Sequence, residues 1–166
     1  MDRTQEGRLT AAGRVTIAVV AVIVFIVDRI TKGVVGANLP LGSERQVLPF
    51  LWIANTQNSG AAFGVGRNVT LLFLTASVVI AVIIVVYAIR TPLDVWTGIV
   101  LGLVLGGTVG NGYDRLFHGQ VTDFLDLHWW PVFNVADSAI SVGMVLLVLG
   151  FLVRRSDAGT SAPQRR

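Results

Sequence analysis

The chain has 166 residues, of which 53% are hydrophobic and only 14% are charged, and its mean hydropathy is +0.69. About a quarter of the residues in soluble globular domains are charged, so this composition excludes an ordinary soluble domain and points to a membrane protein. Because the chain has no cysteine, a disulfide framework and a thiol nucleophile are excluded as well.

Four apolar segments are long enough to cross a bilayer, which takes about 20 helical residues. In chain order they cover residues 15–36, 69–89, 95–117 and 132–153. They are too long for barrel strands and lack polar/apolar alternation, so they are predicted to be helices. The first segment has the basic start of a signal peptide, but its length and charged end favour a retained helix. We therefore expect an all-α membrane protein, a four-transmembrane-helix bundle spanning residues 15–153.

Basic residues are concentrated at one side of this bundle. Eight of the thirteen flank the cytoplasmic ends of the predicted spans: Arg3, Arg8, Arg14, Arg90, Arg154, Arg155, Arg165 and Arg166. The positive-inside rule then places the N-terminal segment 1–14 and the polar, disordered tail 154–166 in the cytoplasm. This distribution also accounts for the pI near 10.2, so we expect no nucleic-acid partner.

Two segments are left on the outer side, residues 37–68 and 118–131. The first contains QVLPFLWIAN, whose β-type residues predict a short strand pair that Pro49 confines to an edge. We expect this loop to form a small platform and the second loop to gate the space beneath it. Asp126, in the second loop, reads as a solvated residue.

Carboxylates occur where a membrane chain should avoid them. Asp28 lies two thirds of the way along the first span, Asp114 lies near the outer end of the third, and Asp137 lies in the first turns of the fourth. An intramembrane carboxylate is costly and faces a partner or a wet cavity. Asp123 lies in the short outer loop and can fold back over the same level. These residues predict a polar pocket at the outer end of the bundle.

Structural roles compete for several of these residues. Asp28 and Lys32, at i and i+4, suit a helical ion pair, and Asp114 beside Arg115 suits a charge pair that anchors a helix end. Asn134 suits a helix N-cap. Glycines 98, 102, 106 and 110 form a small-residue stripe that favours close helix packing.

Two carboxylates held close together share a proton near neutral pH, so that one serves as base and the other as acid in peptide hydrolysis. Asp123 and Asp137 suit this chemistry, because capping explains only one of them. A serine/lysine site lacks a placed serine, the two histidines form no H-E-x-x-H motif, and Gly110-Asn111-Gly112-Tyr113-Asp114 misses G-x-G-D by one residue. A small proton-coupled transporter is the non-enzymatic alternative.

Five motifs occur in a fixed order along the four spans: DRITK (28–32), NSGAAFG (58–64), GNGYDR (110–115), VTDF (121–124) and FNVADS (133–138). With these motifs residues 15–153 resemble the lipoprotein signal peptidases, also called signal peptidase II. VTDF replaces the VVDF-type motif of that family, a mild change beside the aspartate.

The resemblance implies a membrane aspartic endopeptidase that removes the signal peptide from diacylglyceryl-modified prolipoproteins, on the N-terminal side of the lipidated cysteine. It implies a bacterial cytoplasmic membrane location, a site near the outer face, membrane lipids around a monomer, and neither metal nor organic cofactor. Asp123 and Asp137 would be the catalytic pair, and Asp28 and Lys32 a structural polar pair. The residues expected to bind substrate or support the site are Asn58, Gly60, Asn111, Asp114, Arg115 and Asn134.

Overall fold

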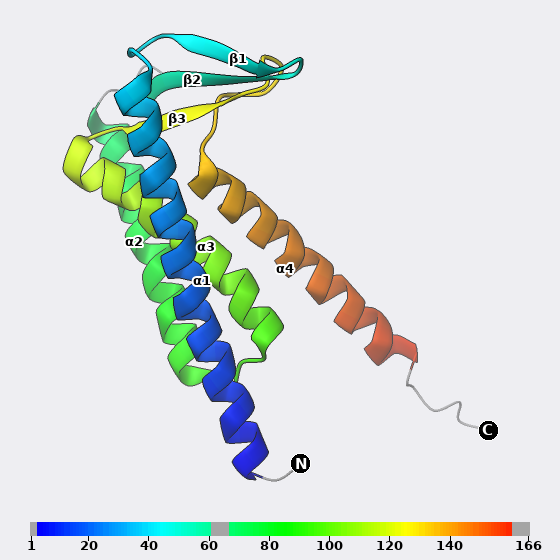
Figure 1. Cartoon of the computed structure of the whole chain (residues 1–166). Helices are drawn as coiled ribbons and strands as arrows, with labels where there is room; N and C mark the ends of the chain where they lie inside the picture. The colour runs from blue at the N-terminus through cyan, green and yellow to red at the C-terminus, as the bar shows by residue number, and fades with distance from the viewer. Residues whose placement is uncertain (1–2, 61–66, 161–166) are drawn as a thin grey trace.

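A computed structural model describes residues 3–60 and 67–160 of the chain. It contains four long helices and a small antiparallel sheet that covers one end of the helices (Figure 1). The helices are α1 (Arg3–Asn38), α2 (Arg67–Arg90), α3 (Val95–His118) and α4 (Val135–Thr160), and the strands are β1 (Glu44–Leu48), β2 (Leu51–Asn58) and β3 (Val121–Asp126). The predicted four-helix membrane fold with a β platform is confirmed.

Each helix contains a stretch long and apolar enough to span a membrane: Thr10–Asn38, Val69–Arg90, Val95–His118 and Val135–Val153. Most of their large apolar side chains are exposed on α1, α2 and α4, as lipid contact requires. The helical backbone also continues beyond two predicted limits, back to Arg3 in α1 and on to Thr160 in α4. Residues 154–160, expected to be disordered, are therefore helical, because no proline interrupts the helix before residue 163.

The central element of the bundle is α3, which packs against α1, α2 and α4. Over half of its apolar window is buried, against a sixth or less for the other three helices. Its glycine stripe faces α1: a Cβ on Gly98 or Gly106 would approach backbone carbonyl oxygens of α1 at 2.5 and 2.7 Å. The stripe therefore serves helix packing, as its spacing predicted.

The ends of α3 follow ordinary capping rules. Asp94 caps the start by accepting a hydrogen bond from the backbone N–H of Thr97 at 2.7 Å, and Gly119 ends the helix with φ of 75°. Only glycine adopts that left-handed conformation without strain. The chain can then turn sharply from α3 into β3.

The sheet joins the two outer loops into one layer with strand order β1-β2-β3. The pairing of β1 with β2 was expected, with Pro49 in the turn between them, whereas β3 was not. In the β2–β3 ladder Thr56 stands opposite Asp123 and Asn58 opposite Val121. Residues 121–126, predicted to belong to a separate gating loop, are therefore a strand of the platform itself.

The segment that precedes α4 is tied to β3. Phe133 donates from its backbone N–H to the carbonyl of Leu125 at 3.0 Å and accepts from Leu125 at 2.7 Å. This bridge delays the start of α4 to Val135, three residues after the predicted limit at 132. It also brings the first turn of α4 beside β3, and with it Asp137 toward Asp123.

Candidate active site

Asp123 lies on β3, and only 3% of its surface is exposed. Its two carboxylate oxygens accept hydrogen bonds from side-chain amides, Oδ2 from Asn58 at 2.9 Å and Oδ1 from Asn134 at 2.7 Å. Burial raises the pKa of Asp123 above its ordinary value, and the charge of Asp137 raises it further, against the lowering effect of the two amides. Asp123 is thus a carboxyl group whose proton is held more firmly than usual.

Asp137 lies in the first turn of α4 and forms a reciprocal cap with Asn134. The side-chain oxygen of Asn134 accepts from the backbone N–H of Asp137 at 2.9 Å, and Oδ2 of Asp137 accepts from the backbone N–H of Asn134 at 3.2 Å. This is the geometry of a capping box, so the predicted cap is confirmed. The other oxygen, Oδ1, accepts from the side-chain amide of Asn111 at 2.7 Å.

The two carboxylates are joined by amides. The side-chain nitrogen of Asn134 donates to Asp123 and, at 3.2 Å, to the side-chain oxygen of Asn111. The side-chain nitrogen of Asn111 in turn donates to Asp137. Four elements supply these groups: β2, α3, β3 and the start of α4. The structure therefore brings together five of the predicted site residues at one end of the bundle: Asn58, Asn111, Asp123, Asn134 and Asp137.

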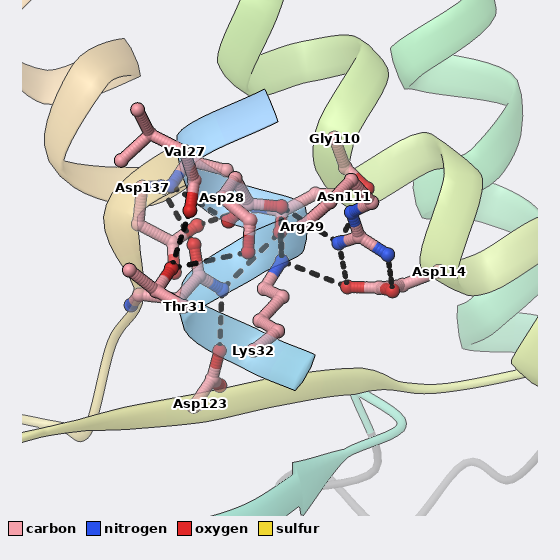
Figure 2. A network of polar contacts seen from close by, with 12 residues as sticks. Val27, Asp28, Arg29, Thr31, Lys32, Gly110, Asn111, Asp114, Asp123 and Asp137 are labelled. Atoms are coloured by element: carbon pink, nitrogen blue, oxygen red, sulfur yellow. Dashed lines mark hydrogen bonds and ion pairs between the residues drawn. The ribbon is translucent and has the colours of Figure 1, made fainter. Parts of the chain in front are cut away.

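Next to this pair lies a cluster of opposite charges between α1 and α3, drawn in Figure 2. Asp28 is fully buried and accepts from Arg29 at 2.6 Å and from Lys32 at 3.0 Å. Asp114 accepts from Lys32 at 2.7 Å and from both terminal nitrogens of Arg29. The helical ion pair of Asp28 and Lys32 is therefore present, as part of a four-residue cluster between α1 and α3.

Asp28 also acts on α4. Its second oxygen accepts a hydrogen bond from the backbone N–H of Ala136 at 3.1 Å, next to Asp137 in the chain. Lys32, on the same side, donates to the side-chain oxygen of Asn111 at 2.9 Å. The cluster is thus connected to the Asp137 side of the site by two routes.

Arg115 does not pair with Asp114, the alternative that the sequence left open. Its guanidinium donates to the backbone carbonyl of Asn111 at 3.3 Å and lies over the ring of Phe73 at 5.1 Å. Its Nε is buried without a hydrogen-bond partner among the described residues. Its charge acts on Asp137 and Asp123, as that of Lys32 does, and its Nε remains a free donor among the described residues.

The NSGAAFG motif is described only as far as Gly60, and residues 61–64 lie outside the described residues. Gly60 has φ of 76°, and its backbone N–H donates to the side-chain oxygen of Asn58 at 2.8 Å. A Cβ at Gly60 would lie 2.7 Å from Val69 and 2.8 Å from Phe73. The glycine therefore permits the turn that orients Asn58 toward Asp123.

Asp126 is not the solvated residue that the sequence suggested. It lies on β3 with 8% of its surface exposed and accepts from the backbone N–H of His128 at 2.7 Å, because the unexpected strand turns it inward. Potential ligand atoms of Glu44, Asp126 and His128 lie within 4.8 Å of one another, so these three side chains could hold a cation. This group includes neither Asp123 nor Asp137.

Sequence reasoning missed Arg29, which binds both acids of the cluster. The signal was present, because an arginine inside a membrane span must find an anionic partner, and Arg29 follows Asp28 directly. It also missed β3, since VTDFLD does not alternate cleanly and its burial pattern has two consecutive buried residues, Asp123 and Phe124.

A groove of about 460 Å³ opens beside Asp137, between the start of α4 and the segment that precedes it. Its lining is mostly apolar and includes Trp129, Trp130, Phe133, Ser138 and Val142. Trp129 is 75% exposed at its edge. An acidic side chain is thus reachable from the apolar surface of the bundle.

This arrangement suits acid–base hydrolysis. Asp123, which is buried, and Asp137, which is half-buried, share a network in which all four carboxylate oxygens accept hydrogen bonds. Burial raises the pKa of Asp123, and Arg115 lies nearby with an Nε that has no hydrogen-bond partner among the described residues. One carboxylate can take a proton from water while the other, protonated, donates to a carbonyl oxygen.

Comparison with known proteins leads to the same chemistry. Residues 20–153 match the family model described as signal peptidase (SPase) II. The lipoprotein signal peptidase of Syntrophomonas wolfei subsp. wolfei is 41% identical over 76% of this chain and 86% of its own length, and that of Desulfitobacterium hafniense is 40% identical over 79% and 89%.

A solved structure described as a bacterial membrane enzyme, determined by the in meso method at 1.9 Å resolution, superposes with a TM-score of 0.78. It is 30% identical to this chain, over 82% of this chain and 92% of its own. A second such structure, at 2.3 Å resolution, gives the same TM-score at 28% identity over 91% and 94%. The chain therefore belongs to the signal peptidase II family of membrane peptidases.

Proposed function

We propose that this chain removes the signal peptide from diacylglyceryl-modified prolipoproteins by cutting on the N-terminal side of the lipidated cysteine, with Asp123 and Asp137 as the catalytic pair. The observation that carries the proposal is the amide network that holds these two carboxyl groups together at one end of a membrane bundle. Family membership supports the substrate class, since the curated relatives are lipoprotein signal peptidases.

In the proposed reaction the ionised member of the pair takes a proton from a water molecule, whose oxygen attacks the scissile carbonyl carbon. The protonated member donates its proton to the carbonyl oxygen, giving a tetrahedral diol. The carboxyl that took the proton from water then donates it to the leaving nitrogen, while the other carboxylate takes a proton from a diol hydroxyl. The C–N bond breaks, the C=O bond forms again, and the pair is restored. Burial and the neighbouring charge of Asp137 raise the pKa of Asp123, which is the direction that a pair sharing one proton requires.

The neighbouring residues divide into two roles in this proposal. The charge of Arg115 acts on both carboxyl groups, and its Nε has no hydrogen-bond partner among the described residues, so Arg115 is suited to hold a substrate carbonyl. Asn58, Asn111 and Asn134 orient the carboxylates, and Gly60 shapes the turn beside Asn58. Lys32 holds Asn111, and Asp28 and Asp114 hold Lys32.

The groove beside Asp137 gives the substrate a route from the bilayer. Its apolar lining suits a membrane-embedded signal peptide and its acyl chains, which can stay among lipid tails while the peptide bond reaches the carboxylates. Trp129 and Trp130 at the edge suit the membrane interface, where tryptophan is enriched.

We further propose that the protein is a monomer in the bacterial cytoplasmic membrane, with both termini in the cytoplasm and the sheet on the outer face. The arginines that flank the membrane helices on the side away from the sheet support this orientation. An exported prolipoprotein presents its cleavage point at the outer surface, which is where the proposed catalytic pair would then lie.

The test is a gel-mobility assay on a diacylglyceryl-modified prolipoprotein with Asp123→Asn, Asp137→Asn and, as matched control, Asp94→Asn. The change at position 94 retains helix capping at the opposite end of α3, because asparagine caps as well as aspartate. We expect no detectable cleavage by the first two variants, since loss of one acid–base group costs about 10²–10⁴-fold in rate. Near-normal cleavage by either would refute the assignment of the pair.

A further inference from the structure

Arg29 donates hydrogen bonds to two buried acids and to a backbone carbonyl. On α1, its terminal nitrogens donate to Asp28 at 2.6 Å, to both oxygens of Asp114, and to the backbone carbonyl of Gly110 at 3.4 Å. Its guanidinium lies 5.0 Å from the ring centroid of Tyr113. Figure 2 shows it facing Asp114 from α1, beside Lys32. Both terminal nitrogens of the guanidinium are thus engaged within α1 and α3, while its Nε is buried without a hydrogen-bond partner among the described residues.

The charges of this cluster balance. Asp28 and Asp114 supply two negative charges, and Arg29 and Lys32 supply two positive charges, with each cation in contact with each acid. Both acids are almost wholly buried, so solvent does little to screen them. Removal of Arg29 would leave a single ammonium group facing two buried carboxylates.

This charge balance affects the proposed active site because Lys32 also binds Asn111. Its ammonium donates to the side-chain oxygen of Asn111 at 2.9 Å, which leaves the side-chain nitrogen of Asn111 to donate to Asp137 at 2.7 Å. An ammonium drawn toward two unneutralised carboxylates would weaken its hydrogen bond to Asn111. The orientation of the amide at Asp137 therefore depends on the neutralisation of Asp114 by Arg29.

We propose that Arg29 is a positioning residue for the peptidase reaction: it neutralises Asp28 and Asp114, so that Lys32 can hold Asn111 in the orientation that donates to Asp137. This inference rests on the proposed function of Asp123 and Asp137. It assigns a task to a residue that touches neither of them.

The charged and titratable groups around Arg29 determine the expected effect of its removal. They are Asp28 and Lys32 on α1, Asp114, Arg115 and His118 on α3, Asp123 on β3, and Asp137 on α4. Loss of the guanidinium adds one unbalanced negative charge below the catalytic pair. Ionisation of the pair then becomes less favourable, so the acid limb of the pH–rate profile moves to higher pH, by on the order of one unit.

The experiment compares Arg29→Gln and Arg29→Lys with Arg14→Gln. Arg14 is a matched control, since it also bridges two helices, donating from α1 to the carbonyls of Ala88 and Ile89 at 2.8 Å each, near the opposite end of α1. Cleavage of a diacylglyceryl-modified prolipoprotein is measured over pH in detergent, giving kcat and KM. In protein labelled with ¹⁵N asparagine, the side-chain amide signal of Asn111, identified by its loss in Asn111→Ala, is followed independently of turnover.

We expect Arg29→Gln to lower kcat roughly ten- to a hundred-fold with little change in KM, as misplacement of a catalytic group does. Its acid limb should move to higher pH, and the Asn111 amide signal should shift. Arg29→Lys keeps the positive charge but loses the paired donors of the guanidinium. Its acid limb should therefore match that of the wild type, while its kcat should be reduced. Arg14→Gln should resemble the wild type in all three readouts.

The proposal is overturned if Arg29→Gln matches Arg14→Gln in kcat, pH profile and amide signal. If Arg29→Gln does not fold, Arg29→Lys decides: a shifted acid limb or an unchanged kcat refutes the account. If the wild type cuts no lipidated prolipoprotein, the proposed function fails, whereas the amide signal still tests whether Arg29 orients Asn111.

Discussion

The replacement of Asp28 by asparagine tests how much the buried charge cluster contributes to stability. Asp28 is completely buried, and each of its oxygens already accepts: Oδ1 from the backbone N–H of Ala136, and Oδ2 from Arg29 and Lys32. Asparagine is the same shape but offers one oxygen and one N–H₂ group. Whichever way the amide is turned, a donor faces a donor, and the two cations lose a charge partner.

The structure sets the size of the effect. No part of the Asp28 side chain is exposed, so no discount for solvent screening applies. Breaking a buried, hydrogen-bonded ion pair by removing one partner typically costs about 3–5 kcal/mol. We therefore expect the free energy of unfolding of Asp28→Asn to fall by about that amount, a large part of the stability of a typical domain.

The assay is unfolding by added sodium dodecyl sulfate in mixed micelles, followed by far-ultraviolet circular dichroism, on the wild type, Asp28→Asn and Asp94→Asn. Asparagine at position 94 keeps the cap of α3, so that variant should lose much less stability than Asp28→Asn. If the two variants unfold alike, Asp28 is not an energetically important partner and the reasoning from burial is wrong.

Three further predictions concern packing, pH and the platform. Gly107→Ala puts a Cβ 2.4 Å from a backbone carbonyl oxygen of α4, so it should destabilise the protein by about 1–3 kcal/mol. Gly33→Ala, with open space around it, should be neutral or slightly stabilising. The same unfolding assay measures both variants, and equal stability of the two would contradict the packing account. Because the folded-state pKa of Asp123 is raised above the ordinary 3.8, its contribution to stability is complete below that value and is lost as pH rises through the folded-state pKa. Asp123→Asn should therefore gain stability relative to the wild type as pH rises from about 4 toward neutrality, and a constant difference would contradict this. Asn55→Ala removes the hydrogen bond of 2.7 Å to the carbonyl of Leu39 and should speed proteolysis of the sheet by an added soluble protease, with unchanged digestion as the contrary result.

Four membrane helices and the meeting of the acidic residues could be predicted from the sequence because both follow from simple physics. Long apolar segments can only be helices in lipid, and a carboxylate inside one must face polar partners. The stripe from Gly98 to Gly110 likewise predicted close packing, and α1 lies against it. The family motifs added the peptidase reading, which the family match supports over the transporter that remained as an alternative.

What the sequence did not show depends on contacts between distant segments. The pairing of β3 with β2 joins residues about 65 positions apart, and no local pattern in VTDFLD predicts this pairing. Asp126 is buried for the same reason. Asp114 stands beside Arg115 in the chain, yet the two cations that bind it, Arg29 and Lys32, come from α1. Neighbouring side chains on a helix point about 100° apart, and α1 approaches only one of those faces.

The proposed catalytic pair is divided between two elements that fold in different surroundings. Asp123 belongs to β3, which pairs with β2 in the sheet outside the membrane-spanning helices. Asp137 belongs to α4, which contains a membrane-spanning segment. Insertion of the four helices alone therefore cannot complete the site, since β3 must still pair with β2 before Asn58 and Asn134 can both reach Asp123. A newly inserted chain thus lacks its proposed catalytic pair until β3 has paired with β2.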